Sequence, residues 1–212
     1  MSVRAAIDAG AFADLREILA ASPRLVNELV EWGEHRQLRT HPLHYVCDKR
    51  FDGTITKEAA LLLVEELIVA GANVNDHAKD REPPLHGAAS LGAEDVGLRL
   101  LDAGAIPGAL GMFRETALHW ASSLGLDRLA FRLIDAGADV NLEDVRFGAS
   151  ALGWALHGRA NSPPANQGRQ VEVIALLVES GATVTTGQLV SATLRADWKL
   201  LAALRAQVRN RH

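Results

Sequence analysis

Apolar residues recur along this chain at three- and four-residue steps, in short stretches that are separated by polar or glycine-containing turns. The clearest examples are Leu61, Leu62, Leu63, Val64, Leu67 and Ile68, and then Val171, Val173, Ile174, Leu176, Leu177 and Val178. This spacing is typical of helices with one buried face. Each stretch is followed by a Gly-Ala pair, and glycine adopts most easily the left-handed backbone that ends a helix. The pattern therefore predicts an all-α protein of short helices.

A six-residue phrase precedes four such helices. It reads Pro-Leu-His-Tyr-Val-Cys at 42–47, Pro-Leu-His-Gly-Ala-Ala at 84–89, Ala-Leu-His-Trp-Ala-Ser at 117–122 and, in degraded form, Ala-Leu-Gly-Trp-Ala-Leu at 151–156. The leucines of successive phrases are 42, 33 and 34 residues apart. A fixed period of this length indicates a repeat protein, in which each unit buries its apolar face by stacking on its neighbours.

The phrase, the period near 33 residues and the turns Gly-Ala-Asn-Val-Asn at 71–75 and Gly-Ala-Asp-Val-Asn at 137–141 resemble the ankyrin repeat family. The resemblance covers residues 1–186 and implies a solenoid of helix-turn-helix repeats with short β-turn fingers. We expect a single domain, residues 1–212. It would comprise an N-terminal capping repeat at 1–37, phrase-bearing repeats at 38–79, 80–112, 113–146 and 147–186, and a C-terminal helical cap at 187–212.

Two of the repeats are longer than the others. From the phrase leucine to the glycine of the next turn, the first and last phrase-bearing repeats take 28 and 29 residues, against 19 in the middle two. The surplus falls at 49–57 and 159–169, which are rich in turn-forming residues. We expect two inserted loops on the same rim of the stack. They would either bracket the groove as lids or be tolerated surface insertions.

Composition narrows the functional classes. The net charge of −4 does not favour nucleic acid or an anionic membrane as a partner. No uncharged apolar run approaches the roughly 18 residues of a membrane span, and the N-terminus does not resemble a signal peptide. The single cysteine, Cys47, occupies a small-residue position of the phrase and is interpreted as a buried thiol. We expect a cytoplasmic protein with no cofactor.

The phrase histidines are the first candidates for chemistry. His44, His86 and His119 recur once per repeat. The resemblance implies a structural role, in which each ring bridges loop backbone groups of adjacent repeats. Stacked helices lie on the order of 10 Å apart, whereas metal ligands converge to about 2 Å from one ion. No metal site is predicted.

The residue after each phrase histidine is the main binding candidate. The resemblance implies that it projects from the first helix into the concave groove, together with the residue one turn later and the finger residue before the phrase. The candidate binding residues are Tyr45, Asp48, Glu82, Ser90, Glu115, Trp120, Ser123, Trp154 and His157. Aromatic residues dominate contact energy at interfaces, so we expect Tyr45, Trp120 and Trp154 to anchor a protein or peptide. The acidic candidates favour Lys or Arg on that partner.

A small-molecule site or an enzyme is the alternative. Trp120 and Trp154 would form the floor of an apolar pocket with a few polar groups. In acid–base chemistry of a cyclase, isomerase or hydrolase type, His157 would carry the proton, with Glu115 as its partner and Ser123 as donor or nucleophile. No catalytic motif accompanies these residues. A third interpretation is that the two indoles only pack beneath the inserted loops.

Gly153 replaces the histidine of the fourth phrase. Glycine inside a helix costs about 1 kcal/mol relative to alanine. We therefore expect a ligand or the 159–169 loop to approach the backbone closely at this point. The alternative is that a repeat next to a cap has drifted in sequence.

Overall fold

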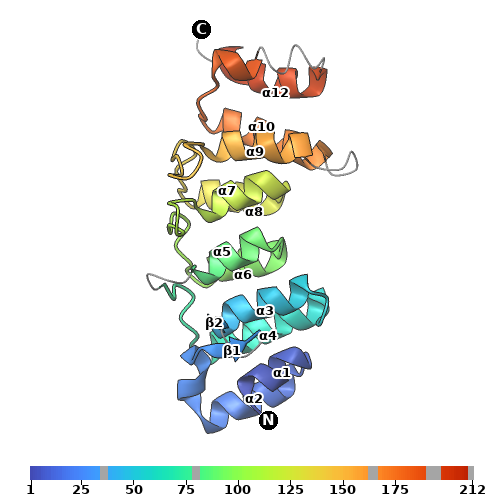
Figure 1. Ribbon diagram of the computed structural model, residues 1–212, viewed down its shortest axis with the longest axis vertical. Coiled ribbons are helices and arrows are strands. Elements are labelled where there is room, and N and C mark those ends of the chain that lie inside the picture. Colours follow the sequence, from blue (N-terminus) through green and yellow to red (C-terminus); the bar gives the residue numbers. More distant parts are fainter. Residues whose placement is uncertain (34–37, 78–81, 162–166, 190–196, 210–212) are drawn as a thin grey trace. The chain divides into compact units, whose positions relative to one another are not determined.

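The computed structural model of the protein describes residues 1–33, 38–77, 82–161, 167–189 and 197–209 (Figure 1). The chain divides into two compact units, Met1–Ile106 and Pro107–His212. Each unit is built from short helices that pack in pairs, α1 on α2, α3 on α4 and α5 on α6 in the first, and α7 on α8 and α9 on α10 in the second. The predicted helical repeat architecture is confirmed.

In unit 1, the N-terminal segment forms a complete helix pair, α1 (Val3–Asp8) and α2 (Phe12–Ala21). The first phrase begins α3 (Pro42–Phe51), which is followed by α4 (Lys57–Val69). The second phrase begins α5 (Pro84–Ser90), which is followed by α6 (Glu94–Asp102). Pro42 and Pro84 occupy the first turn of their helices, where the missing N–H costs no hydrogen bond.

A β-hairpin interrupts the helical pattern of unit 1. After a short 3-10 helix, η1 (Pro23–Asn27), strand β1 (Val30–Trp32) pairs antiparallel with β2 (Leu38–Thr40), with Val30 opposite Thr40. The indole N–H of Trp32 donates to Thr40 Oγ1 across the strands at 3.0 Å. The expected finger is therefore a paired hairpin rather than a simple turn. The expected boundary at residue 37 lies outside the described residues.

In unit 2, the third phrase begins α7 (Ala117–Leu124), followed by α8 (Asp127–Asp135). The fourth begins α9 (Ala151–Asn161), followed by α10 (Gln167–Glu179), and α12 (Trp198–Arg209) packs on α10. Asp197 fixes the start of this last helix: it accepts a hydrogen bond from the N–H of Leu200 at 3.1 Å and an ion pair from Arg159 at 2.6 Å. The C-terminal helix is thereby tied to α9.

The surplus segments lengthen helices, and the expected loop at 49–57 is wrong. Helices α3 and α4 have 10 and 13 residues, against 7 and 9 in α5 and α6. Only residues 52–56 connect α3 to α4, and Asp52 closes that turn by accepting from the N–H of Thr54 at 2.9 Å. In the second surplus segment, 159–161 and 167–169 are helical, and 162–166 lie outside the described residues.

Asparagine side chains join successive Gly-Ala turns. The turn glycines at 71, 104, 137 and 181 have φ values of +90°, +89°, +92° and +95°, as predicted. Asn75, four residues after Gly71, donates from Nδ2 to the carbonyl of Gly104 at 3.0 Å and accepts from the N–H of Ile106 at 2.8 Å. We call this pair of bonds the Asn bridge.

A second Asn bridge lies in unit 2. Asn141, four residues after Gly137, donates to the carbonyl of Gly181 at 3.1 Å and accepts from the N–H of Thr183 at 2.8 Å. The equivalent position after Gly104 is Gly108, which has no side chain to form the bridge.

Candidate functional site

Two tryptophans of unit 2 lie against each other. Trp120 on α7 and Trp154 on α9 have ring centroids 4.9 Å apart and meet edge to face at 77°. Both side chains are partly exposed. Edge-to-face contact at this distance is a favourable arrangement of aromatic rings. The two indoles are therefore adjacent, as the repeat period predicts.

Asp144 holds Trp154 in place. The indole N–H of Trp154 donates to Asp144 Oδ2 at 2.9 Å. The same carboxylate accepts from the backbone N–H groups of Arg146 and Phe147, both at 2.7 Å, and of Ala149 at 3.2 Å. Burial alone would raise the pKa of Asp144, but the hydrogen bonds from Trp154 and the backbone outweigh it and hold the pKa below its usual value.

Exposed aromatic rings continue from Trp154 onto the two fingers of unit 2, which are residues 108–116 and 142–150. Phe147 contacts Trp154 with a centroid separation of 5.9 Å. The Arg146 guanidinium lies 5.2 Å from the ring of Phe147 and 5.2 Å from that of Phe113. The exposed fractions of Phe113 and Phe147 are 39% and 65%. We call Phe113, Trp120, Arg146, Phe147 and Trp154 the aromatic surface.

Backbone contacts fix the two fingers to each other. The N–H of Val145 donates to the carbonyl of Phe113 at 2.8 Å, and Phe113 in turn donates its own N–H to Glu115 Oε2 at 2.8 Å. The phenylalanines and Asp144 were not among the sequence-predicted site residues. Their signal in the sequence is weak, because finger conformation depends on these carboxylate–backbone bonds and not on a periodic pattern.

Glu115 is not on the rim of a groove. Its exposed fraction is 3%, and its carboxylate folds back over Gly111, where a Cβ would lie 2.7 Å from the Glu115 Cδ. The expected role as a surface acid is wrong because this carboxylate satisfies the finger backbone. His157 is exposed, with Nε2 3.3 Å from the Asn161 side-chain nitrogen. Glu115 is therefore not available as the carboxylate partner of His157 in the acid–base set that the sequence suggested.

The close backbone approach in α9 occurs at Gly158 rather than at Gly153. A Cβ on Gly158 would overlap the carbonyl oxygen of Ser123 and lie 2.8 Å from its carbonyl carbon. A Cβ on Gly153 would meet Ala149 Cβ at 3.1 Å. Ser123 is partly exposed, and its carbonyl also accepts from the Gln170 side chain at 3.4 Å. The close approach that we expected at Gly153 therefore lies about one and a half turns later in α9. It is a contact between α9 and α7 at Gly158.

The histidine-bridge prediction fits His119. Its Nδ1 accepts from the N–H of Thr116 at 3.0 Å, and its Nε2 lies 3.1 Å from the carbonyl of Leu142 in the next finger. Burial lowers the pKa of His119, which favours the neutral ring that this donor–acceptor pattern requires.

In the first phrase-bearing repeat a different histidine makes a comparable bridge. His41 Nδ1 accepts from the N–H of Leu43 at 3.2 Å, and its Nε2 lies 3.0 Å from Asn27 Oδ1. His44 instead pairs with Asp48 at 3.2 Å, one turn along α3. The bridging role expected for His44 is therefore wrong, and Asp48 is engaged within its own helix.

Tyr45 is not an exposed anchor. Its exposed fraction is 1%, and the ring of Trp32 from strand β1 covers it with centroids 5.5 Å apart. Lys49 Nζ lies 5.4 Å from each ring centroid, and the Tyr45 hydroxyl donates to Asp8 Oδ1 at 2.6 Å. Burial, and then the bond to Asp8, raise the pKa of Tyr45. The expectation fails because the hairpin supplies a second ring that the phrase does not encode.

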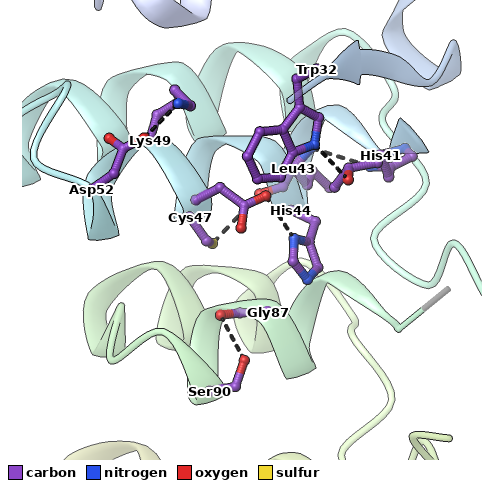
Figure 2. A network of polar contacts seen from close by, with 11 residues as sticks. Trp32, His41, Leu43, His44, Cys47, Lys49, Asp52, Gly87 and Ser90 are labelled. Carbon is purple, nitrogen blue, oxygen red and sulfur yellow. Dashed lines mark hydrogen bonds and ion pairs between the residues drawn. The ribbon is translucent and has the colours of Figure 1, made fainter. Parts of the chain in front are cut away.

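Gly87, which replaces the aromatic residue in the second phrase, does not leave an open space beside it. A Cβ there would lie 2.6 Å from His44 Nε2, so the imidazole occupies the room that the missing side chain leaves (Figure 2). Ser90 is partly buried with Oγ 3.5 Å from the Gly87 carbonyl, and Glu82 is partly buried. The unit 1 candidates therefore contact their own chain, whereas exposed aromatic rings gather in unit 2.

Across the part of the chain that the structure describes, no group of three or more His, Cys, Asp or Glu side chains could hold a metal ion. None of the described helices is long and apolar enough to cross a membrane. The family model for ankyrin repeats (3 copies) matches residues 55–144, which run from the turn before α4 to Asp144. A search of curated proteins finds no match.

Proposed function

We propose that this chain, whose residues 55–144 are ankyrin repeats, is a protein-interaction module that binds its partner through the aromatic surface of unit 2. Ankyrin repeats form extended surfaces for protein partners. The observation that carries the finer proposal is the row of touching rings from Trp120 through Trp154 to Phe147, which ends in a side chain 65% exposed.

Exposed rings in contact with one another are a costly arrangement for a surface without a partner. Isolated apolar residues on a surface need no explanation, but a contiguous apolar patch marks an interaction site. Aromatic side chains have few rotatable bonds, so they lose little conformational entropy on binding and often carry most of the contact energy. The contacts of Trp154 with Asp144 and Phe147 hold the rings in place before a partner arrives.

Trp120 supports a role beyond packing. Its indole nitrogen is buried and has no hydrogen-bond partner among the described residues. A buried donor without an acceptor costs about 1–3 kcal/mol. If Trp120 served packing alone, a phenylalanine ring, which has no N–H donor, would do so without this cost. We therefore attribute the indole at this position to contact with a partner. Ser123 and His157, on the same two helices, are the polar groups that we propose beside the anchors.

Affinity capture with matched variants tests the proposal. Phe147→Ala removes a highly exposed ring of the aromatic surface, and Trp154→Ala removes its centre. Phe131→Ala on α8, where the ring is 55% exposed, is the control for loss of any surface phenylalanine. We expect proteins captured by the wild type and by Phe131→Ala to be lost with the other two. The affinity loss should be about 2 kcal/mol or more, which is roughly 30-fold.

Circular dichroism of each variant establishes that the helices are retained. Undiminished binding by a folded Phe147→Ala and a folded Trp154→Ala would contradict the proposal. Equal loss with Phe131→Ala would move the binding surface to the second helices.

A further inference from the structure

We infer that the partner presents an extended segment with an apolar side chain beside a carboxylate, and that Arg146 and Arg114 receive the carboxylate. The apolar side chain packs on Phe113 and Phe147. This inference rests on the proposed function, because it names the chemistry of the partner that the aromatic surface binds.

On the two fingers of unit 2, two of the acidic side chains are buried and both arginines are exposed. Glu115 and Asp144 are each 3% exposed and turn inward to backbone N–H donors. The exposed charged residues of fingers 108–116 and 142–150 are Arg114, Glu143 and Arg146. Neither arginine has an ion pair with an acidic side chain in the part of the chain that the structure describes. The side chains offered to a partner are thus mainly cationic.

Arg146 is prepared to bind a carboxylate. Its guanidinium lies near the rings of both Phe113 and Phe147, so cation–π contact restricts the side chain before binding. A guanidinium stacked on rings keeps its planar edge available for two parallel hydrogen bonds to a carboxylate. The neighbouring Val145, 63% exposed, and Met112, 64% exposed, supply the apolar contact beside it.

Arg114 provides an independent observation. Its φ is +62°, which lies in the left-handed region, and no other non-glycine residue among those that the structure describes has a positive φ. A bulky residue is disfavoured there, and such strain concentrates at binding and switch positions. Glycine or asparagine would form this turn at lower cost, whereas arginine adds a second cation next to Phe113.

Two of the three acidic candidates that favoured a basic partner are engaged within the chain. Asp48 pairs with His44, and Glu115 is buried in its finger. A polyanion is also a poor match, because the protein carries a net charge of −4 and its fingers present two arginines rather than an extended basic stripe. A short segment that combines one apolar side chain with one carboxylate matches both features of the surface.

Peptide selection on the immobilised full-length chain tests the inference. A display library of random linear twelve-residue peptides is selected on the wild type, on Arg146→Glu and on Arg205→Glu. Arg205 is exposed on α12, so its variant carries the same change in net charge away from the fingers. We expect wild-type peptides to place an apolar residue beside Asp or Glu, and to bind Arg205→Glu within about twofold.

Binding of these peptides to Arg146→Glu should fall at least tenfold, and selection on that variant should yield Lys or Arg in place of the carboxylate. Peptides that need Trp154 but contain no acidic residue, or that bind Arg146→Glu unchanged, overturn the inference and leave the proposed function standing. If every selected peptide binds Trp154→Ala as well as the wild type, the proposed function itself fails.

Discussion

The hydrogen bonds of Asp144 are the feature whose removal should change the aromatic surface most. The carboxylate accepts four bonds, two on each oxygen: Arg146 and Phe147 donate to Oδ1, and Ala149 and Trp154 donate to Oδ2. In Asp144→Asn, one oxygen becomes an NH2 group. Whichever way the amide turns, two of the four donors then face another donor.

The expected cost follows from these bonds. A hydrogen bond to a charged group contributes about 1.5–3 kcal/mol, and a donor left without an acceptor costs about 1–3 kcal/mol. The finger residues are exposed, so water replaces part of what their N–H groups lose. We therefore use the lower end of the range and expect Asp144→Asn to reduce the free energy of unfolding of unit 2 by about 2–3 kcal/mol. Asp139→Asn is the control, because Asp139 is exposed and accepts one backbone bond, from Asn141.

A double-mutant cycle isolates the bond to the indole. Trp154→Phe removes the N–H donor and keeps an aromatic ring, so Asp144→Asn should cost less in that background. The coupling energy from urea titrations followed by circular dichroism should be about 1–2 kcal/mol. Additivity within about 0.5 kcal/mol would refute the claim that Asp144 positions Trp154. A cost of Asp144→Asn no larger than that of Asp139→Asn would refute the whole assignment.

The pH dependence has a defined sign. Because the pKa of Asp144 is lowered in the folded protein, the carboxylate stabilises the fold above its unfolded pKa of about 4. That contribution is lost as the pH falls through the lower, folded-state pKa. The stability difference between the wild type and Asp144→Asn should therefore be constant near neutral pH and shrink below about pH 4. A difference that persists unchanged in acid would contradict the ionised, hydrogen-bonded carboxylate.

Two further changes test the packing of unit 2. Gly158→Ala places a Cβ against the carbonyl of Ser123 and should lower the free energy of unfolding by about 2–3 kcal/mol in urea titrations, whereas Gly153→Ala, a matched control in the same helix, should be near neutral. Gly108→Asn should form the missing Asn bridge to the Gly137 carbonyl and raise the free energy of unfolding by about 1 kcal/mol, with Gly108→Ala measuring the share that comes from the backbone; no gain of Asn over Ala would count against the bridge.

The repeat architecture was predictable because it is written in a period. The spacing of the phrase leucines and the turn glycines at 71, 104, 137 and 181 appears in the structure as helix pairs ended by left-handed glycines. The prediction of an inserted loop at 49–57 was wrong. Turn-forming residues at 52–53 mark a real turn, but they do not reveal how far the flanking helices extend. A local pattern cannot distinguish a long loop from two longer helices joined by a short one.

The candidate site was predictable only where helices decide it. Trp120 and Trp154 occupy equivalent positions of successive phrases, so the period places them side by side. Tyr45 occupies the same position, yet Trp32 covers it from a hairpin that the helical pattern does not encode. Phe147 and its neighbours depend on a finger folded around one carboxylate, and single-sequence reasoning has no periodic signal for that.

The aromatic residue in the fourth position of the phrase is buried in unit 1 and partly exposed in unit 2, and the conformation of the fingers explains this difference. In unit 1 the finger is a hairpin whose Trp32 packs on Tyr45. The ring of Tyr45, which follows the phrase histidine, is therefore buried and cannot contact a partner. In unit 2 the finger folds around Asp144, which turns its N–H groups inward and leaves Phe147 exposed beside Trp154. The helices of both units supply similar scaffolds. If the proposed function holds, we expect partner binding to depend on the finger carboxylate Asp144 as much as on the aromatic residues themselves, because the folding of this finger leaves Phe147 exposed.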